Sequence, residues 1–336
     1  MTAENPSDAE SHLFVSDFEL DDADRDRLIA ALGAGNAVLV RGADALHQAL
    51  AAHPETEVLC SFRPPADALE LAPGLRWIAL PSAGADSALR AGLVRPGGPI
   101  VTTANGVHAV PMGEHVFGML LMWARNWPML LAAQHERSWP DHPRWRALRG
   151  VELDGATLGI VGLGAIGRQI AQLGRAFGMR VLGVRRSARM GQTDPDVDAL
   201  FPPERLREML ARADYVVIAA PSTPETQHLI GAAELAAMKP TAFLVNIARG
   251  ALVDEPALIG ALGEGRIGGA GLDVFEREPL PPESPLWAMA NVIISPHLAG
   301  SSPAYSRRFT DLLLDNLARY RAGEPLRNVV QPERGY

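Results

Sequence analysis

Apolar residues between about 154 and 300 gather in short runs that are separated by stretches with helical spacing. The runs occupy 158–161, 181–184, 215–220, 242–246, 270–274 and 291–296, with predicted helices at 203–212, 232–238 and 255–264. Runs without polar alternation indicate strands buried on both faces, as in a parallel sheet covered by helices. Another helix is predicted after the first run, where one apolar face recurs at spacings of four, three and four residues: Ile166, Ile170, Leu173 and Phe177.

The first third of the chain repeats this pattern more weakly. Its predicted strands are 37–40, 57–60, 76–81 and 99–103, separated by short helices or loops. A long apolar helix interrupted by Pro128 is predicted over 111–134, and an amphipathic helix over 302–322. This pattern predicts a second, smaller α/β domain, to which the last helix returns.

Composition indicates a soluble globular protein. The 336 residues are 47% hydrophobic and 21% charged, a length suited to two domains. A net charge of -8 argues against nucleic acid as a partner, and the single cysteine, Cys60, excludes a disulfide framework or a cysteine-based zinc site. The N-terminus lacks the basic and apolar regions of a signal peptide, and the apolar run 116–124 is too short to span a bilayer. We therefore expect a cytoplasmic protein without membrane contact.

The hexapeptide GLGAIG at 162–167 fits the dinucleotide-binding pattern G-x-G-x-x-G. It follows a predicted strand and opens a predicted helix, which is the context that this pattern requires. Gly162 would permit a tight turn, Gly164 a close approach of the backbone to a pyrophosphate, and Gly167 close packing of helix on strand. The free N–H groups of the helix N-terminus would face the phosphates.

The residues that follow the second strand bear on the choice of cofactor. An acid about 20 residues beyond the turn usually accepts hydrogen bonds from the ribose hydroxyls of NAD. Here Arg185 and Arg186 occupy that place, followed by Ser187, and an arginine fork binds phosphate oxygens instead. Only one of the 31 basic residues is a lysine, so an isolated arginine means little, but four fall within 180–189. The acids from Asp194 onward are too far along to substitute, so we expect NADP(H) to be preferred over NAD(H).

Polar side chains follow the later strands. Ligands bind beyond the carboxyl ends of strands in open α/β sheets. Pro221 ends the third strand and Arg249 follows the fourth. The fifth strand holds Asp273 and leads to two glutamates, and the sixth ends at His297. These side chains are predicted to converge on the edge that carries the glycine turn.

The motifs GLGAIG, NIARG (246–250), LDVFEREPLP (272–281), SPLW (284–287) and SPHLAG (295–300) resemble the D-2-hydroxyacid dehydrogenase family, in order and in separation. The resemblance is strong over 105–300 and closest to the NADP-dependent glyoxylate and hydroxypyruvate reductases. In the first domain it depends mainly on PSAGADS (81–87). It implies two Rossmann-like, doubly wound domains: a substrate domain of 1–104 plus 302–336, interrupted by a dinucleotide domain of 105–301.

The resemblance implies a catalytic set of Arg249, Glu278 and His297. His297 would protonate the carbonyl oxygen of a 2-keto acid, Glu278 would hold the imidazole ring, and Arg249 would bind the substrate. Glu276 competes for the acid role, but Glu278 is the one followed by Pro-Leu-Pro. The implied cofactor contacts are Gly162, Gly164, Ala165, Ile166, Gly167, Arg185, Arg186, Ser187, Pro221, Ile247 and Asp273.

Further expectations concern the substrate and a second subunit. By the same resemblance, N–H groups around Ala83, Gly84 and Ala85 would bind the substrate carboxylate, and the 111–134 segment would form a homodimer. Trp139 and Trp145 either enter a neighbouring active site or pack in that interface. His108 and His115 lack the partners of a metal site, and none is expected.

Two other functions stay open. One is an NAD-dependent dehydrogenase of the phosphoglycerate type, although the chain ends soon after 322, where many of those enzymes continue into a regulatory domain. The other is a dinucleotide-sensing protein like the co-repressors of this fold, which retain the catalytic residues but favour NAD(H). The fold alone does not determine the substrate.

Overall fold

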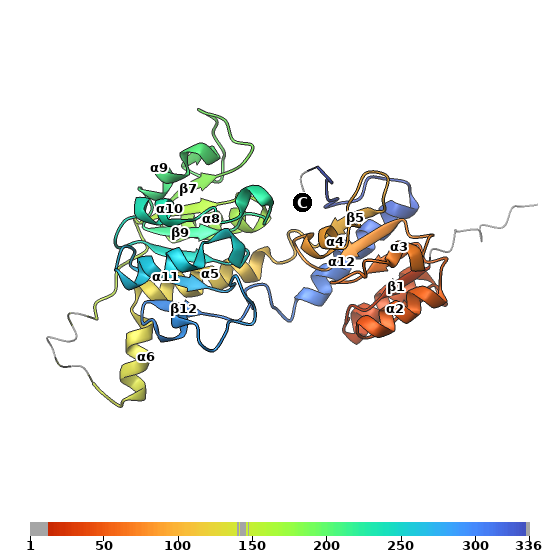
Figure 1. Cartoon of the computed structure of the whole chain (residues 1–336), viewed down its shortest axis with the longest axis horizontal. Helices are drawn as coiled ribbons and strands as arrows, with labels where there is room; N and C mark the ends of the chain where they lie inside the picture. Colours follow the sequence, from red (N-terminus) through yellow and green to blue (C-terminus); the bar gives the residue numbers. More distant parts are fainter. Residues whose placement is uncertain (1–12, 140, 142–145, 147, 334–336) are drawn as a thin grey trace, which may run out of the picture. The chain divides into compact units, whose positions relative to one another are not determined.

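The computed structural model describes residues 13–139, 141, 146 and 148–333. They fall into two compact units (Figure 1). The first unit combines Met1–His108 with Ser302–Tyr336, and the second unit is Ala109–Ser301. Trp145 lies outside the described residues, and Trp139 is 95% exposed.

The second unit contains a sheet of seven parallel strands in the order β12-β11-β10-β9-β6-β7-β8. The strands are β6 (Thr157–Val161), β7 (Arg180–Val184), β8 (Ala199–Phe201), β9 (Tyr215–Ile218), β10 (Phe243–Asn246), β11 (Gly269–Leu272) and β12 (Val292–Ile294). The chain builds outward from β6 in one direction through β7 and β8, and then in the other direction from β9. The strand order therefore reverses between β6 and β9, where open α/β sheets bind their ligands.

Alternate residues of these strands enter two separate cores. Tyr215 and Val217 face one core, whereas Val216 and Ile218 face the other. The first core is closed by α5 (Ala109–Ala124) and α8 (Ala165–Ala176), and the second by α9 (Leu206–Leu210), α10 (Ala232–Ala237) and α11 (Glu255–Gly263). Burial on both faces explains why the strands are apolar without alternation.

The first unit contains five parallel strands in the order β2-β1-β3-β4-β5. The strands are β1 (Phe14–Ser16), β2 (Ala37–Leu39), β3 (Val58–Cys60), β4 (Trp77–Leu80) and β5 (Ile100–Thr103). One face is covered by α2 (Ala43–Ala52), α3 (Ala68–Leu71) and α4 (Asp86–Arg90), and the other by α1 (Asp22–Leu32) and α12 (Tyr305–Arg321). Phe309 and Leu313 of α12 enter the core with Trp77, so the last helix belongs to this unit.

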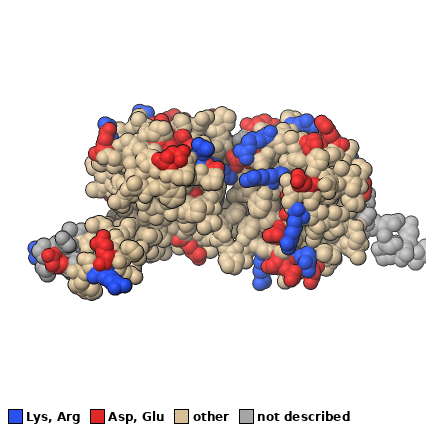
Figure 2. Space-filling model, turned by 60° about the horizontal axis from the view of Figure 1, so that its bottom comes forward, with Lys and Arg blue, Asp and Glu red and all other residues tan. Residues whose placement is uncertain are grey.

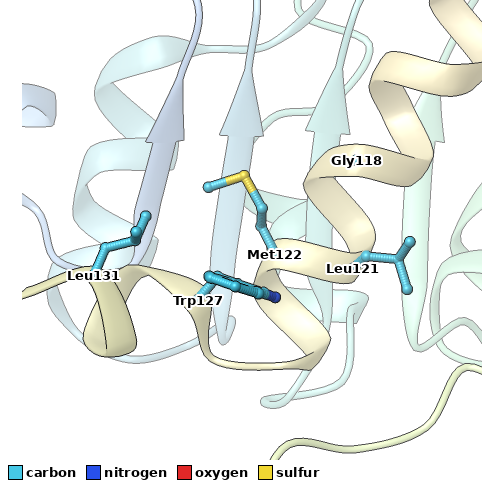
Figure 3. A pocket seen from close by; sticks show the side chains of 5 residues that line it. All are labelled: Gly118, Leu121, Met122, Trp127 and Leu131. Atoms are coloured by element: carbon cyan, nitrogen blue, oxygen red, sulfur yellow. The ribbon is translucent and has the colours of Figure 1, made fainter. Parts of the chain in front are cut away.

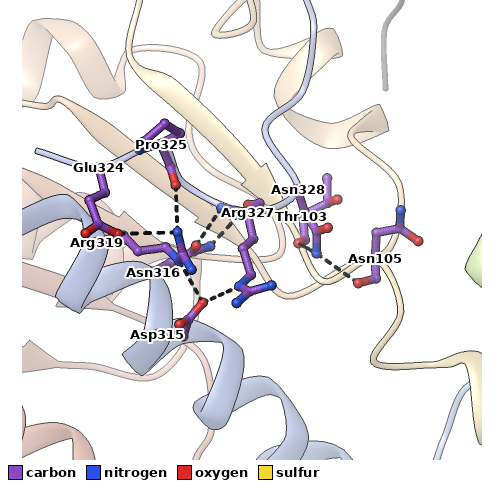
Figure 4. A network of polar contacts seen from close by, with 9 residues as sticks. All are labelled: Thr103, Asn105, Asp315, Asn316, Arg319, Glu324, Pro325, Arg327 and Asn328. Carbon is purple, nitrogen blue, oxygen red and sulfur yellow. Dashed lines mark hydrogen bonds and ion pairs between the residues drawn. The ribbon is translucent and has the colours of Figure 1, made fainter.

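The segment after α12 is held to the first unit by polar contacts (Figure 4). Asp315 on α12 accepts hydrogen bonds from Arg319 (3.1 Å) and Arg327 (2.5 Å). Asn316 binds both the N–H and the carbonyl of Arg327. Asn328 donates to the carbonyl of Thr103 on β5 at 3.2 Å, which ties the chain end to the sheet edge.

Several elements differ from the sequence predictions. The helix expected over 111–134 is two helices, α5 and α6 (Trp127–His135), and the break lies at Asn126, whose φ is 55°. Pro128 lies in the first turn of α6, where a missing N–H costs nothing. Strands β1 and β8 were not predicted.

No helix within the described part of the chain is long and apolar enough to cross a membrane. On the face shown in Figure 2, acidic and basic side chains are intermixed rather than gathered in one basic patch.

Candidate active site

Parallel register aligns the carboxyl ends of the strands in the second unit. Val161 of β6 is paired with Val184 of β7 and Ile218 of β9. The register continues from Ile218 through Asn246 and Leu272 to Ile294 of β12. One sheet edge therefore carries the residues that follow these positions: Gly162, Arg185, Ala219, Ile247, Asp273 and Ser295.

Two glycines of the 162–167 turn are required by the protein itself. Gly162 has a φ of 101°, and a Cβ there would lie 2.7 Å from the backbone of Ala220. A Cβ on Gly167 would lie 2.0 Å from the carbonyl oxygen of Gly162. Gly162 thus makes the turn, and Gly167 allows α8 to start directly against β6.

Gly164 is different. Its φ is -84°, which any residue adopts, and a Cβ there would meet no atom within 4 Å. It is the N-cap of α8 and makes no side-chain cap, so Ala165 and Ile166 begin a helix whose first N–H groups face outward. Among the described residues nothing requires a glycine here, whereas a pyrophosphate that approaches the backbone would.

Arg185 stands at the end of β7 with a buried acid against it. Its Nη1 donates to Asp194 Oδ2 at 2.8 Å. Arg168 on α8 binds both oxygens of Asp194 at 3.0 Å and also pairs with Asp196. The pKa of the Asp194 carboxyl lies below its ordinary value, chiefly because of the hydrogen bonds from Arg168.

Asp194 was expected to lie too far along the chain to replace the ribose-binding acid, and its contact with Arg185 was not predicted. The segment after β7 turns back through Ala188, whose N–H donates to Arg185 O at 2.9 Å. Asp194 is thereby brought to the strand end, with 8% of its surface exposed. Arg168 was not predicted either, although it directly follows the glycine turn.

Arg186 and Ser187 are exposed beyond the same strand. The pKa of Glu225 is lowered, mainly by a hydrogen bond from Thr223 and partly by the charge of Arg186. Glu225 follows the end of β9, where Thr226 donates to the carbonyl of Pro221 at 2.8 Å. The charge of Arg186 therefore acts on the β9 end of the site as well.

Arg249 follows β10 in a loop that Asn246 holds. The buried amide of Asn246 donates to Arg249 O at 2.9 Å and accepts from Ala248 N at 3.1 Å. The Arg249 side chain is partly exposed and donates to the carbonyl of Ala248 at 2.7 Å. The Ile247 side chain is buried in the core and is therefore not available to a ligand.

Glu278 and His297 form a pair. Glu278 Oε2 lies 2.8 Å from His297 Nδ1, and its other oxygen accepts from Phe275 N at 3.1 Å. A carboxylate only accepts, so Nδ1 carries a proton and Nε2 is left to face a ligand. Glu276, the competing acid, lies instead 2.9 Å from His228 Nε2.

Asp273 holds the loop that carries His297. Its side chain is 1% exposed and accepts from the N–H groups of Leu298 and Ala299, each at 2.9 Å, and from Ser295 Oγ at 2.6 Å. Its carbonyl accepts from His297 N at 2.8 Å. His297 is thus fixed in a left-handed conformation with φ 55°.

His115 extends this arrangement to α5. Its Nε2 lies 2.9 Å from Ser295 Oγ and 3.8 Å from Asp273 Oδ1. The single hydroxyl proton of Ser295 goes to Asp273, so Ser295 must accept from a protonated Nε2. The contact between His115 and Ser295 was not predicted from the sequence, although Ser295 belongs to the family motif SPHLAG (295–300).

The first unit holds the 81–87 loop. Ser82 Oγ donates to Gly84 O at 2.6 Å, and the hydroxyl of Tyr305 donates to Pro81 O. Ala83 and Gly84 are partly exposed, whereas Ala85 is buried. The loop is therefore fixed by hydrogen bonds on both sides of residue 83.

A family model matches most of the second unit. Residues 117–299 match the NAD-binding domain of the D-isomer specific 2-hydroxyacid dehydrogenases. The chain belongs to this family. A glyoxylate reductase of Aeropyrum pernix is 38% identical over 278 residues, which cover 80% of this chain and 79% of that protein. A glyoxylate reductase of Pyrococcus furiosus shows the same identity and coverage over 279 residues.

Solved dehydrogenases of the family share both units. A D-isomer specific 2-hydroxyacid dehydrogenase from Xanthobacter autotrophicus, in complex with NADPH and MES, is 32% identical with a TM-score of 0.80, over 97% of this chain and 100% of that one. An NADPH-dependent glyoxylate/hydroxypyruvate reductase from Sinorhizobium meliloti, in complex with NADP and sulfate, is 27% identical with a TM-score of 0.81 at the same coverage. The predicted α/β fold and the predicted oxidoreductase class are thereby confirmed.

Proposed function

We propose that this dehydrogenase reduces a small 2-keto acid of the glyoxylate and hydroxypyruvate type to the D-2-hydroxy acid, and that it prefers NADPH to NADH. The observation that carries the proposal is the Glu278–His297 pair on the sheet edge that also bears the 162–167 turn. In this proposal the second unit binds the dinucleotide and the first unit binds the substrate.

The residues present fit a dinucleotide. The space beside Gly164 and the uncapped start of α8 suit a pyrophosphate, and Arg185 suits a 2′-phosphate because its Nε is buried without a hydrogen-bond partner among the described residues. Ala165, Ile166 and Gly167 would present N–H groups to the phosphates. Ser187, Pro221 and the backbone of Ile247 would line the adenosine side. When bound, NADPH supplies a hydride from its nicotinamide ring.

The reaction also needs a proton at the carbonyl oxygen. His297 Nε2 would donate that proton as the oxygen gains negative charge, while Glu278 holds Nδ1 and stabilises the imidazolium. Arg249 would bind the substrate carboxylate with its fork and fix the carbonyl for attack. Asp273 would keep His297 in place, with one remaining acceptor site for the nicotinamide carboxamide.

The residues at the end of β7 support the preference for NADPH. Arg185 and Arg186 stand where an acid would hold the ribose hydroxyls of NAD, and the nearby carboxylates are already paired with arginines. The relatives with NADP or NADPH bound show that the family accommodates the 2′-phosphate.

For the first unit, we propose that the backbone N–H groups of Ala83, Gly84 and Ala85 bind a carboxylate. The hydrogen bonds of Ser82 and Tyr305 to this loop keep it in one conformation, as an anion site made of backbone N–H groups requires.

We also propose a cytoplasmic homodimer. An apolar hollow lies between α5 and α6, with α6 side chains exposed around it (Figure 3). Trp127, Met129 and Leu131 are 47%, 53% and 45% exposed. A monomer would leave this apolar surface in water, and a second copy would cover it. Light scattering should give twice the chain mass of 35.9 kDa, and a monomer would contradict the proposal.

The test of the activity is the product itself. Hydroxypyruvate and glyoxylate are each incubated with purified protein and NADPH, and the glycerate formed from hydroxypyruvate is resolved by chiral chromatography. We expect D-glycerate, in a stoichiometric ratio to the NADPH consumed. No turnover together with tight dinucleotide binding would contradict a reductase of these two keto acids and favour another substrate or a sensing protein.

A further inference from the structure

The geometry points to Asp194 as a positioning residue for cofactor selectivity: it holds Arg185 so that the Nε edge of this guanidinium is presented to the 2′-phosphate. The inference depends on the proposed use of NADPH. It assigns the selectivity to a buried acid, although in dehydrogenases of this fold an acid near this strand is expected to select against that phosphate.

Asp194 has no capacity left for a ribose hydroxyl. Oδ1 accepts from Arg168 Nη1 at 3.0 Å and from the N–H of Asp196 at 3.1 Å. Oδ2 accepts from Arg168 Nη2 at 3.0 Å and from Arg185 Nη1 at 2.8 Å. An ionised carboxylate offers about four lone-pair sites, and all four are taken. Asp194 therefore cannot act as the acid that reads NAD.

The same contacts determine which nitrogen of Arg185 lacks an acceptor. Nη1 is engaged with Asp194, whereas Nε is buried and has no partner among the described residues. An arginine binds two oxygens of one phosphate through two parallel N–H donors, and Nε with Nη2 forms such an edge. A buried N–H without an acceptor is costly, and a phosphate oxygen would remove that cost.

Arg168 stabilises the buried Asp194 carboxylate when no ligand is bound. Its fork neutralises Asp194 and joins it to α8, one residue beyond the turn that would hold the pyrophosphate. Two arginines and two carboxylates of the cluster, Arg168, Arg185, Asp194 and Asp196, leave no net charge. The contribution of Asp194 to phosphate binding is then one of geometry, since it adds no attraction of its own.

The experiment is a binding titration of Asp194→Asn. Dissociation constants are measured at 0.15 M salt for NADPH, NADH, 2′,5′-ADP and 5′-AMP. Removal of the negative charge of Asp194 would reduce electrostatic repulsion and so strengthen phosphate binding. Weaker binding in this variant must therefore come from the loss of the Arg185 orientation. We expect binding of NADPH and 2′,5′-ADP to weaken about tenfold, and binding of NADH and 5′-AMP to change less than about twofold.

Two further variants keep the outcome interpretable. Asp198→Asn is the matched control, because Asp198 lies in the same segment and accepts from Val181 N at 2.7 Å but does not contact Arg185. It should leave all four constants unchanged. In an Arg185→Gln background, Asp194→Asn should have no further effect, since its partner is already absent.

Three results would overturn the inference. Unchanged or tighter NADPH binding would mean that Asp194 does not orient Arg185. Equal weakening of all four ligands would mean that it only supports the loop. If the unmodified protein binds 2′,5′-ADP no better than 5′-AMP, the proposed NADPH preference itself is wrong, a failure that the first two results do not imply.

Discussion

His297 is held at three points: its backbone N–H by Asp273, its ring by Glu278, and the residues after it by the Asp273 carboxylate. Its φ of 55° is unusual for a residue with a side chain, and Asp273 stabilises it. The imidazole is thus placed by a buried carboxylate that is itself engaged by Ser295. Such fixed placement is what proton transfer to a bound substrate requires.

His297→Asn tests the proton-donor role, because asparagine tolerates the left-handed conformation and removes the ring. We expect kcat to fall by roughly 10² to 10⁴, with NADPH affinity unchanged. His228→Asn is a matched control: His228 has a φ of 50°, is paired with Glu276 at 2.9 Å, and is exposed to a similar extent. Steady-state rates and NADPH titrations check both variants. An equal loss of kcat in the two variants would contradict a specific role of His297 as the proton donor.

The acidic and basic residues of the site could be listed from the sequence, and the contact of Glu278 with His297 was expected from the family resemblance, but the other pairings were not. The strand-end rule and the family motifs singled out Arg249, Glu278 and His297, which the register then placed on one edge. The partners Asp194 and Ser295 depend on how two loops turn back, and no periodic pattern reports a loop conformation.

In the strand–turn–helix unit of β6 and α8, Gly167 is required for folding, whereas Gly164 is proposed to be required for cofactor binding. Gly167→Ala would put a Cβ 2.0 Å from Gly162 O, so we expect it to destabilise the fold by about 1–3 kcal/mol. Gly164→Ala meets no atom, so unfolding should change by less than about 1 kcal/mol.

The Gly164→Ala variant should nevertheless bind NADPH at least about tenfold more weakly, because the added methyl group occupies the approach of the pyrophosphate. Urea unfolding and NADPH titration of both variants check these expectations. Full NADPH affinity in Gly164→Ala would mean that the turn does not bind the cofactor.

Runs of apolar residues made most strands predictable, but β1 and β8 were missed. β9, β10 and β11 were evident because both of their faces are buried. β8 is a three-residue strand at the sheet edge, and β1 also has three residues. The division of 111–134 into α5 and α6 depends on the left-handed conformation of Asn126. The amino-acid composition of this segment does not predict that conformation.

Each unit carries a carboxylate whose pKa arginines hold below the ordinary value. For Asp315 the chief cause is the hydrogen bond from Arg327. A depressed folded-state pKa contributes stability above the unfolded value, and this contribution is lost as the pH falls below about 4. We expect Asp315→Asn to be less stable than the unmodified protein at pH 7, and to approach it near pH 2.5.

Thermal unfolding between pH 2.5 and 7 checks this expectation. A constant difference in Tm across that range would mean that the charge of Asp315 contributes nothing to the attachment of the chain end shown in Figure 4.

Both units together serve one proposed reaction, and its most direct test is the ratio of kcat/KM with NADPH to that with NADH, measured on hydroxypyruvate. The Arg185–Asp194 arrangement predicts a ratio well above ten, and a fall toward one in Arg185→Gln. A ratio of one or less in the unmodified protein would contradict the proposal that this dehydrogenase is built for NADPH.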